Sequence, residues 1–71
     1  MSEYLIHIKR DNLLSVLETL GKLEIQHDPA HVSTELFDTV EMVIIGDEKT
    51  IETDFKLTKD YTQLDSFKKL P

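Results

Sequence analysis

The segment YLIHIKRDNLLSVLETLG, residues 4–21, contains the two clearest structural patterns in the chain. Its first six side chains alternate, with Tyr4, Ile6 and Ile8 on one face, and this period of two is typical of a β-strand. After Asp11, leucine and valine recur at helical spacing and form one apolar stripe. The segment therefore predicts a strand followed by an amphipathic helix.

Two residues are predicted to bound this helix. The carboxylate of Asp11 can accept a hydrogen bond from a free backbone N–H at the positive end of the helix dipole, so we expect it to be the N-cap. Gly21 stands where helices commonly end in a left-handed residue, a conformation that glycine adopts without a steric penalty.

Further strands are predicted downstream. Residues 23–27 alternate again and should end at Pro29, because proline cannot donate to a strand ladder. Residues 30–38 are ambiguous: Ser33 could cap one helical turn, or the segment could extend the next strand, and we expect a loop with a short turn. Residues 39–45 are rich in β-branched side chains and predict a strand.

The second half of the chain is predicted to form a hairpin and a last helix. Gly46 and Asp47 favour a turn. Residues 50–57 alternate, which predicts an amphipathic strand paired with residues 39–45. The side chains expected to point inward from this strand are Ile51, Thr53, Phe55 and Leu57. Thr58 or Thr62 could then cap a short helix that carries Tyr61, Leu64 and Phe67.

This order of elements, β-α-β-β-β-α, predicts one α+β domain spanning residues 1–71. We expect a two-layer sandwich in which the main helix covers one face of a mostly antiparallel sheet, with a short helix at the C-terminus. A chain of 71 residues buries a small core, and without cysteine no disulfide can reinforce it. We therefore expect a homodimer.

The charge is strongly segregated along the chain. Residues 24–54 carry nine carboxylates and one lysine, whereas the formal net charge of the whole chain is −6. Such a surface repels nucleic acid and anionic membranes and attracts basic proteins. We take these nine carboxylates as the candidate partner-binding residues: Glu24, Asp28, Glu35, Asp38, Glu41, Asp47, Glu48, Glu52 and Asp54.

The spacing of some of these carboxylates suggests imitation of a DNA backbone. Outward residues two apart on a strand lie about 7 Å from each other, which is close to the distance between successive phosphates. On the predicted hairpin, Glu52 and Asp54 have this relation and Glu41 stands beside them. We interpret the chain as a DNA mimic that occupies the DNA-binding surface of a basic protein. The alternative without a binding function is an acidic face that only keeps the protein soluble.

No motif for catalysis or for a cofactor occurs in the chain. There is no glycine-rich phosphate loop, and the absence of cysteine excludes a cysteine-based metal site. His27 and His31 have the i, i+4 spacing of a helical metal site, but Pro29 lies between them, so a polar loop is favoured. We expect no catalytic residue, metal or cofactor, and a cytoplasmic protein without a signal peptide or membrane span.

Length, lack of cysteine and the acidic run of residues 24–54 together resemble a known group of proteins. The chain is similar to the small acidic host-takeover proteins of lytic Bacillus phages, which include inhibitors of the bacterial nucleoid protein HU. The resemblance implies a homodimer in the host bacterial cytoplasm that binds HU and displaces DNA.

A second hypothesis is an interaction module that uses apolar surface rather than charge. It would bind a host enzyme or a second copy of itself through Val43 and Ile45, or through the segment between Tyr61 and Phe67. Its binding would depend little on salt, whereas binding by charge weakens as salt screens it.

Overall fold

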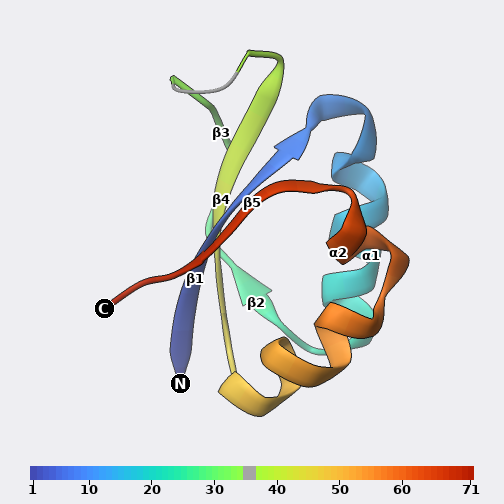
Figure 1. The fold of residues 1–71 in the computed structure, drawn as a ribbon, viewed down its shortest axis with the longest axis vertical. Helices are drawn as coiled ribbons and strands as arrows, with labels where there is room; N and C mark the ends of the chain where they lie inside the picture. The colour runs from blue at the N-terminus through green and yellow to red at the C-terminus, as the bar shows by residue number, and fades with distance from the viewer. Residues whose placement is uncertain (35–36) are drawn as a thin grey trace.

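The computed structural model describes residues 1–34 and 37–71, and it has two layers, a β-sheet and a layer of helices on one of its faces (Figure 1). The strands are β1 (Ser2–Lys9), β2 (Gln26–His27), β3 (His31–Val32), β4 (Thr39–Gly46) and β5 (Leu64–Lys69). The helical elements are η1 (Arg10–Asn12), α1 (Leu13–Lys22), η2 (Thr50–Asp54), η3 (Phe55–Leu57) and α2 (Lys59–Thr62). The predicted α+β class with an antiparallel sheet is confirmed.

Strand β1 is in the middle of the sheet. It pairs antiparallel with β4 along its whole length, from Ser2 opposite Gly46 to Lys9 opposite Thr39, and its other edge pairs with β5. Both β2 and β3 pair with the far edge of β4, so they act as one interrupted edge strand. The sheet order β2-β4-β1-β5 and the element order β-α-β-β-α-β are those of the split βαβ arrangement.

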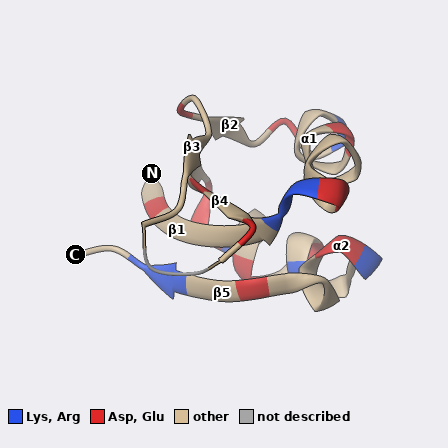
Figure 2. Ribbon diagram, turned by 90° about the horizontal axis from the view of Figure 1, so that it is seen from above, with Lys and Arg blue, Asp and Glu red and all other residues tan. Residues whose placement is uncertain are grey.

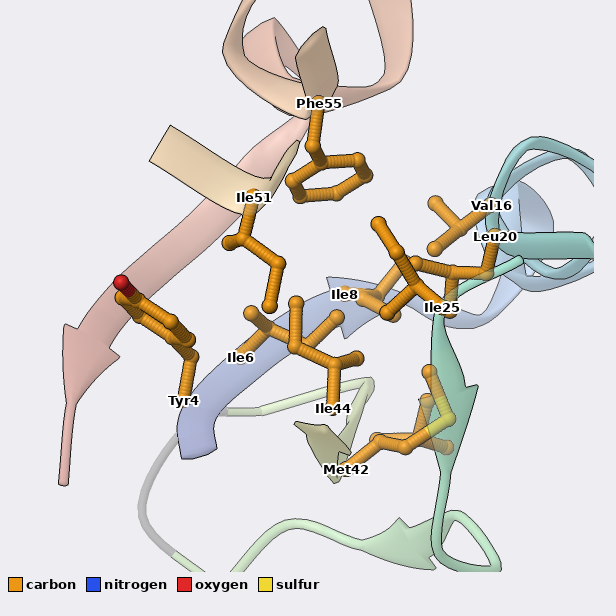
Figure 3. Packing of buried hydrophobic residues seen from close by; sticks show 11 residues of the cluster. Tyr4, Ile6, Ile8, Val16, Leu20, Ile25, Met42, Ile44, Ile51 and Phe55 are labelled. Carbon is orange, nitrogen blue, oxygen red and sulfur yellow. The ribbon is translucent and has the colours of Figure 1, made fainter. Parts of the chain in front are cut away.

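The core lies between the two layers. The buried apolar side chains of the sheet are Tyr4, Ile6, Ile8, Val40, Met42 and Ile44. Figure 3 shows Ile51 and Phe55 reaching down from the helical layer towards this face, with Val16 and Leu20 of α1 beside them. Each such side chain contributes about 1.5–3 kcal/mol when fully buried.

The predicted strand over residues 50–57 is wrong, because this segment is helical. Ile51 and Phe55 are fully buried, as both patterns require, but Thr53 and Leu57 are exposed, which only the helical pattern explains. The backbone N–H of Thr50 donates to the carboxylate of Asp47 at 3.1 Å, which satisfies a free donor at the start of the helical segment. The predicted hairpin between residues 39–45 and 50–57 is therefore also wrong. The strand that precedes β4 and pairs with it is β3, which lies inside the predicted loop of residues 30–38.

The C-terminal prediction is right only for its first turn. Thr58 caps α2, since its hydroxyl accepts a hydrogen bond from the backbone N–H of Tyr61 at 3.3 Å. The helix then ends at Thr62, and the following residues form β5 instead of continuing it. Pairing with β1 satisfies backbone groups that would otherwise lie open on that edge, and it stacks Phe67 on Tyr4 with ring centroids 5.0 Å apart.

Both predicted helix caps are wrong. Helix α1 begins after Asn12, and Asp11 lies in the preceding turn η1. Gly21 is inside α1 and has no positive φ; the left-handed residue that reverses the chain is Glu24, with φ of 57°. The turn around Glu24 takes up the first part of the predicted strand 23–27. Only its last two residues, Gln26 and His27, pair with β4.

Helix α2 is joined to α1 by a carboxylate. Asp60 has only 9% of its surface exposed and accepts hydrogen bonds from the hydroxyls of Ser15, at 2.6 Å, and Thr19. Ser15 and Thr19 are four residues apart and so lie on the same side of α1. Hydrogen bonds to a charged group are the stronger kind, so this contact fixes how the two helices lie on the sheet.

We predict that Gly21→Ala stabilises the protein by about 0.5–1 kcal/mol, because glycine inside a helix has excess freedom in the unfolded chain. No atom lies within 4 Å of the added methyl group, so it meets no steric obstacle. Urea unfolding followed by circular dichroism measures the change. A destabilised variant would instead support the left-handed cap that the sequence suggests.

A second prediction tests the helical geometry of residues 50–57. Phe55→Ala should cost about 3–5 kcal/mol, since it leaves a cavity in the core. Leu57→Ala should change the free energy of unfolding by less than about 0.5 kcal/mol, because 82% of Leu57 is exposed. Comparable losses in the two variants, measured by urea unfolding, would indicate the alternating strand.

Candidate functional site

The structure does not form the predicted row of carboxylates on a hairpin. Glu41 lies on β4 in the sheet, whereas Glu52 and Asp54 lie in η2 on the helical layer. Figure 2 shows acidic positions on strands and helices alike, interspersed with basic ones. Among the predicted site residues, Glu35 lies outside the described residues, and the other eight fall into two groups.

The first group has a basic neighbour. The ion pairs are Asp38 with Arg10 (3.6 Å), Glu52 with Lys56 (2.8 Å), and Glu48 with Lys69, and a carboxylate oxygen of Glu41 lies 3.2 Å from Nε2 of His7. Hydrogen bonds from Lys69 and from Lys56 lower the pKa of Glu48 and of Glu52, respectively. Each of these carboxylates thus has a basic side chain of the same chain beside it.

The second group consists of Glu24, Asp28, Asp47 and Asp54, which form no ion pair within residues 1–34 and 37–71. Asp47 instead accepts a hydrogen bond from the backbone N–H of Thr50 at the start of the helical segment. The other three are exposed to solvent. This group is the part of the predicted site that can offer uncompensated charge to a partner.

Strand pairing places two of these residues, Glu24 and Asp47, near the same end of the sheet as Glu3, which lies in another part of the chain. Ile45 lies between Glu3 on β1 and Gln26 on β2, so Glu3, Glu24 and Asp47 are each within two residues of this one row of the sheet. Glu48 is fixed beside them, because it accepts a hydrogen bond from the hydroxyl of Ser2 at 3.2 Å. We call Glu3, Glu24, Asp47 and Glu48 the acidic end.

Sequence reasoning missed Glu3, because the acidic run begins only at residue 24. The signal was present in the alternation of β1, which puts Glu3 on the face opposite Tyr4. Its use required knowing that the start of β1 pairs with the end of β4, more than 40 residues away. Pairings of this separation are not encoded in any local pattern.

The sheet face turned away from the helices is the second candidate surface, and we call it the open face. At its centre Leu5 pairs with Val43, and Ile45 lies next to them on β4; all three are half-buried. By contrast, Tyr61 and Phe67 are packed against the core with ring centroids 5.2 Å apart. Tyr61 and Phe67 are also half-buried, but of the two apolar surfaces suggested by the sequence only the one with Val43 and Ile45 lies on the sheet face away from the helices.

No group of three or more metal-ligating side chains is present in the described part of the chain, and the same residues form no pocket. Among these residues, no helix has the length and apolar character required to cross a membrane. Comparison with protein-family models, with curated proteins and with solved structures finds no match to this chain.

Tyr4 links the core to the charged surface. Its side chain is fully buried, and burial, together with the nearby carboxylate of Glu52, raises the pKa of Tyr4 to about 12. Burial is the larger cause, and within the described residues the Tyr4 hydroxyl makes no hydrogen bond of good geometry. The folded state thus holds the phenol proton more tightly than the unfolded state does.

We predict that this difference destabilises the protein in alkali. The stabilising contribution is fully present below the unfolded pKa of 10 and is lost as pH rises from 10 towards 12. Tyr4→Phe should remove this part of the decline and have little effect at pH 7, because it deletes a buried hydroxyl without a partner. Urea unfolding of both proteins between pH 8 and pH 11 tests this; parallel curves would contradict it.

Proposed function

We propose that the protein binds a basic DNA-binding protein and blocks its DNA-binding surface, with carboxylates of the acidic end taking the place of phosphates. The resemblance described above makes the nucleoid protein HU the first partner to test. The observation that carries the proposal is that Glu3, Glu24 and Asp47 are each within two residues of one row at the end of the sheet and form no ion pair in the described residues.

The backbone at Glu24 supports a role for its carboxylate. A left-handed residue after a helix is usually glycine or asparagine, because other side chains are strained there. This chain has a glutamate at that position, with φ of 57°, and thereby holds a charge at the acidic end at some cost in stability. A requirement for binding explains why such a cost would be tolerated.

The electrostatics of the chain favour the same kind of partner. With a net charge of −6, the protein attracts a basic surface over a distance and repels nucleic acid. Uncompensated acids lose little when they bind, because no internal ion pair has to break first. Those that are already paired, such as Glu52 with Lys56, are less suited to the role.

The test is the affinity for purified HU, measured by competition with fluorescent DNA at increasing salt. We expect the affinity to fall with salt. The double substitution Glu3→Lys with Glu24→Lys should weaken binding about tenfold or more. The matched control is Glu18→Lys with Asp54→Lys, which changes the net charge equally but lies on the helical layer.

Equal losses in the two double variants would show that net charge alone drives binding, and unchanged affinity in the first would exclude the acidic end. Glu24→Gly separates binding from stability. This variant should be more stable, by about 1 kcal/mol, because glycine relieves the left-handed strain, yet it should bind HU less tightly. Weaker binding by a more stable protein cannot be attributed to misfolding.

A further inference from the structure

The open face carries opposite charges at the two ends of one row of side chains. Leu5 lies opposite Val43 on one side and opposite Lys68 on the other. On the far edge, the backbone N–H of Asp28 donates to the carbonyl of Val43 at 2.9 Å, which places Asp28 at the other end of the row. The row therefore reads Asp28, Val43, Leu5, Lys68, with an acid, two aliphatic side chains and a base.

Such a row is complementary to itself when it is reversed. A twofold axis that runs along the strands, between β1 and β4, places the row of one copy on the reversed row of another. Leu5 then meets Val43 of the second copy, and Lys68 meets Asp28 of the second copy. Both charged residues are exposed and form no ion pair within the described residues of one chain, so each is free to pair across the axis.

The next row has the same property. His7 lies opposite Glu41 within the chain, so the same axis also sets His7 of one copy facing Glu41 of the other. Only 4% of His7 is exposed, and its Nδ1 has no hydrogen-bond partner among the described residues.

We propose that the open face is the interface between two copies of this chain, stacked face to face about this axis. A stable interface buries about 800 Å² on each partner, which is about a sixth of the 4696 Å² surface of one chain. An aliphatic centre with charged residues at the rim is the usual anatomy of such an interface. A sandwich of two stacked sheets also covers the half-buried Leu5, Val43 and Ile45.

Sedimentation equilibrium of the full chain, without any other protein, tests the proposal. We expect the mass of two 8.2 kDa chains. Lys68→Glu and Asp28→Lys should each raise the dissociation constant at least about tenfold, because each puts like charges opposite one another. The protein with both substitutions should recover the dimer, since the charges are then exchanged but still complementary.

The control substitutions are Lys59→Glu and Asp54→Lys, which make the same changes of charge on the helical layer and should leave the dimer intact. Val43→Asp should give a monomer with an unchanged circular dichroism spectrum. A monomer at all concentrations, a dimer that survives Val43→Asp, or single charge reversals that the second one does not rescue would each overturn the proposal. Because HU is absent, these outcomes are independent of the test of the acidic end.

Discussion

The burial of the apolar face of β1 is the constraint on which the rest of the structure depends. Tyr4, Ile6 and Ile8 are fully buried, and they contact helical residues from both halves of the chain. Both edges of β1 are also paired, by β4 and β5. The helices lie on one face of the sheet (Figure 1), and on the other face Leu5, Val43 and Ile45 are left half-buried.

The sequence predicts the fold correctly where the spacing of apolar residues fits either a strand or a helix but not both. The strand from Tyr4 and the helix with Val16 and Leu20 are of this kind, because each has several turns or repeats of a single period. In residues 50–57 the pattern fits two periods, since Ile51 and Phe55 are four residues apart and satisfy both alternation and a helical stripe. In the sequence, the apolar Leu57 favours alternation. Only the structure shows that its side chain is exposed and so does not belong to the buried face.

The candidate site was predictable in its chemistry but not in its geometry. Composition indicates an excess of exposed carboxylates, and those of Glu24, Asp28, Asp47 and Asp54 are exposed. Which carboxylates remain uncompensated depends on tertiary contacts, such as that of Lys69 with Glu48, 21 residues away. Strand β5, which carries Lys69, was predicted as helix, and this error concealed both that ion pair and the base at the end of the open face.

The two proposed surfaces share Glu3, which lies opposite Ile45 on the open face, and otherwise use different residues. The acidic end lies where β1 begins and β4 ends, whereas the open face is the side of the sheet away from the helices. A twofold axis along the strands leaves the direction of each strand unchanged, so it sets the acidic ends of the two copies side by side. Their mutual repulsion acts over about 8 Å at physiological salt and opposes the dimer. A basic partner relieves that repulsion, and it meets twice as many carboxylates as one chain offers, so each association favours the other.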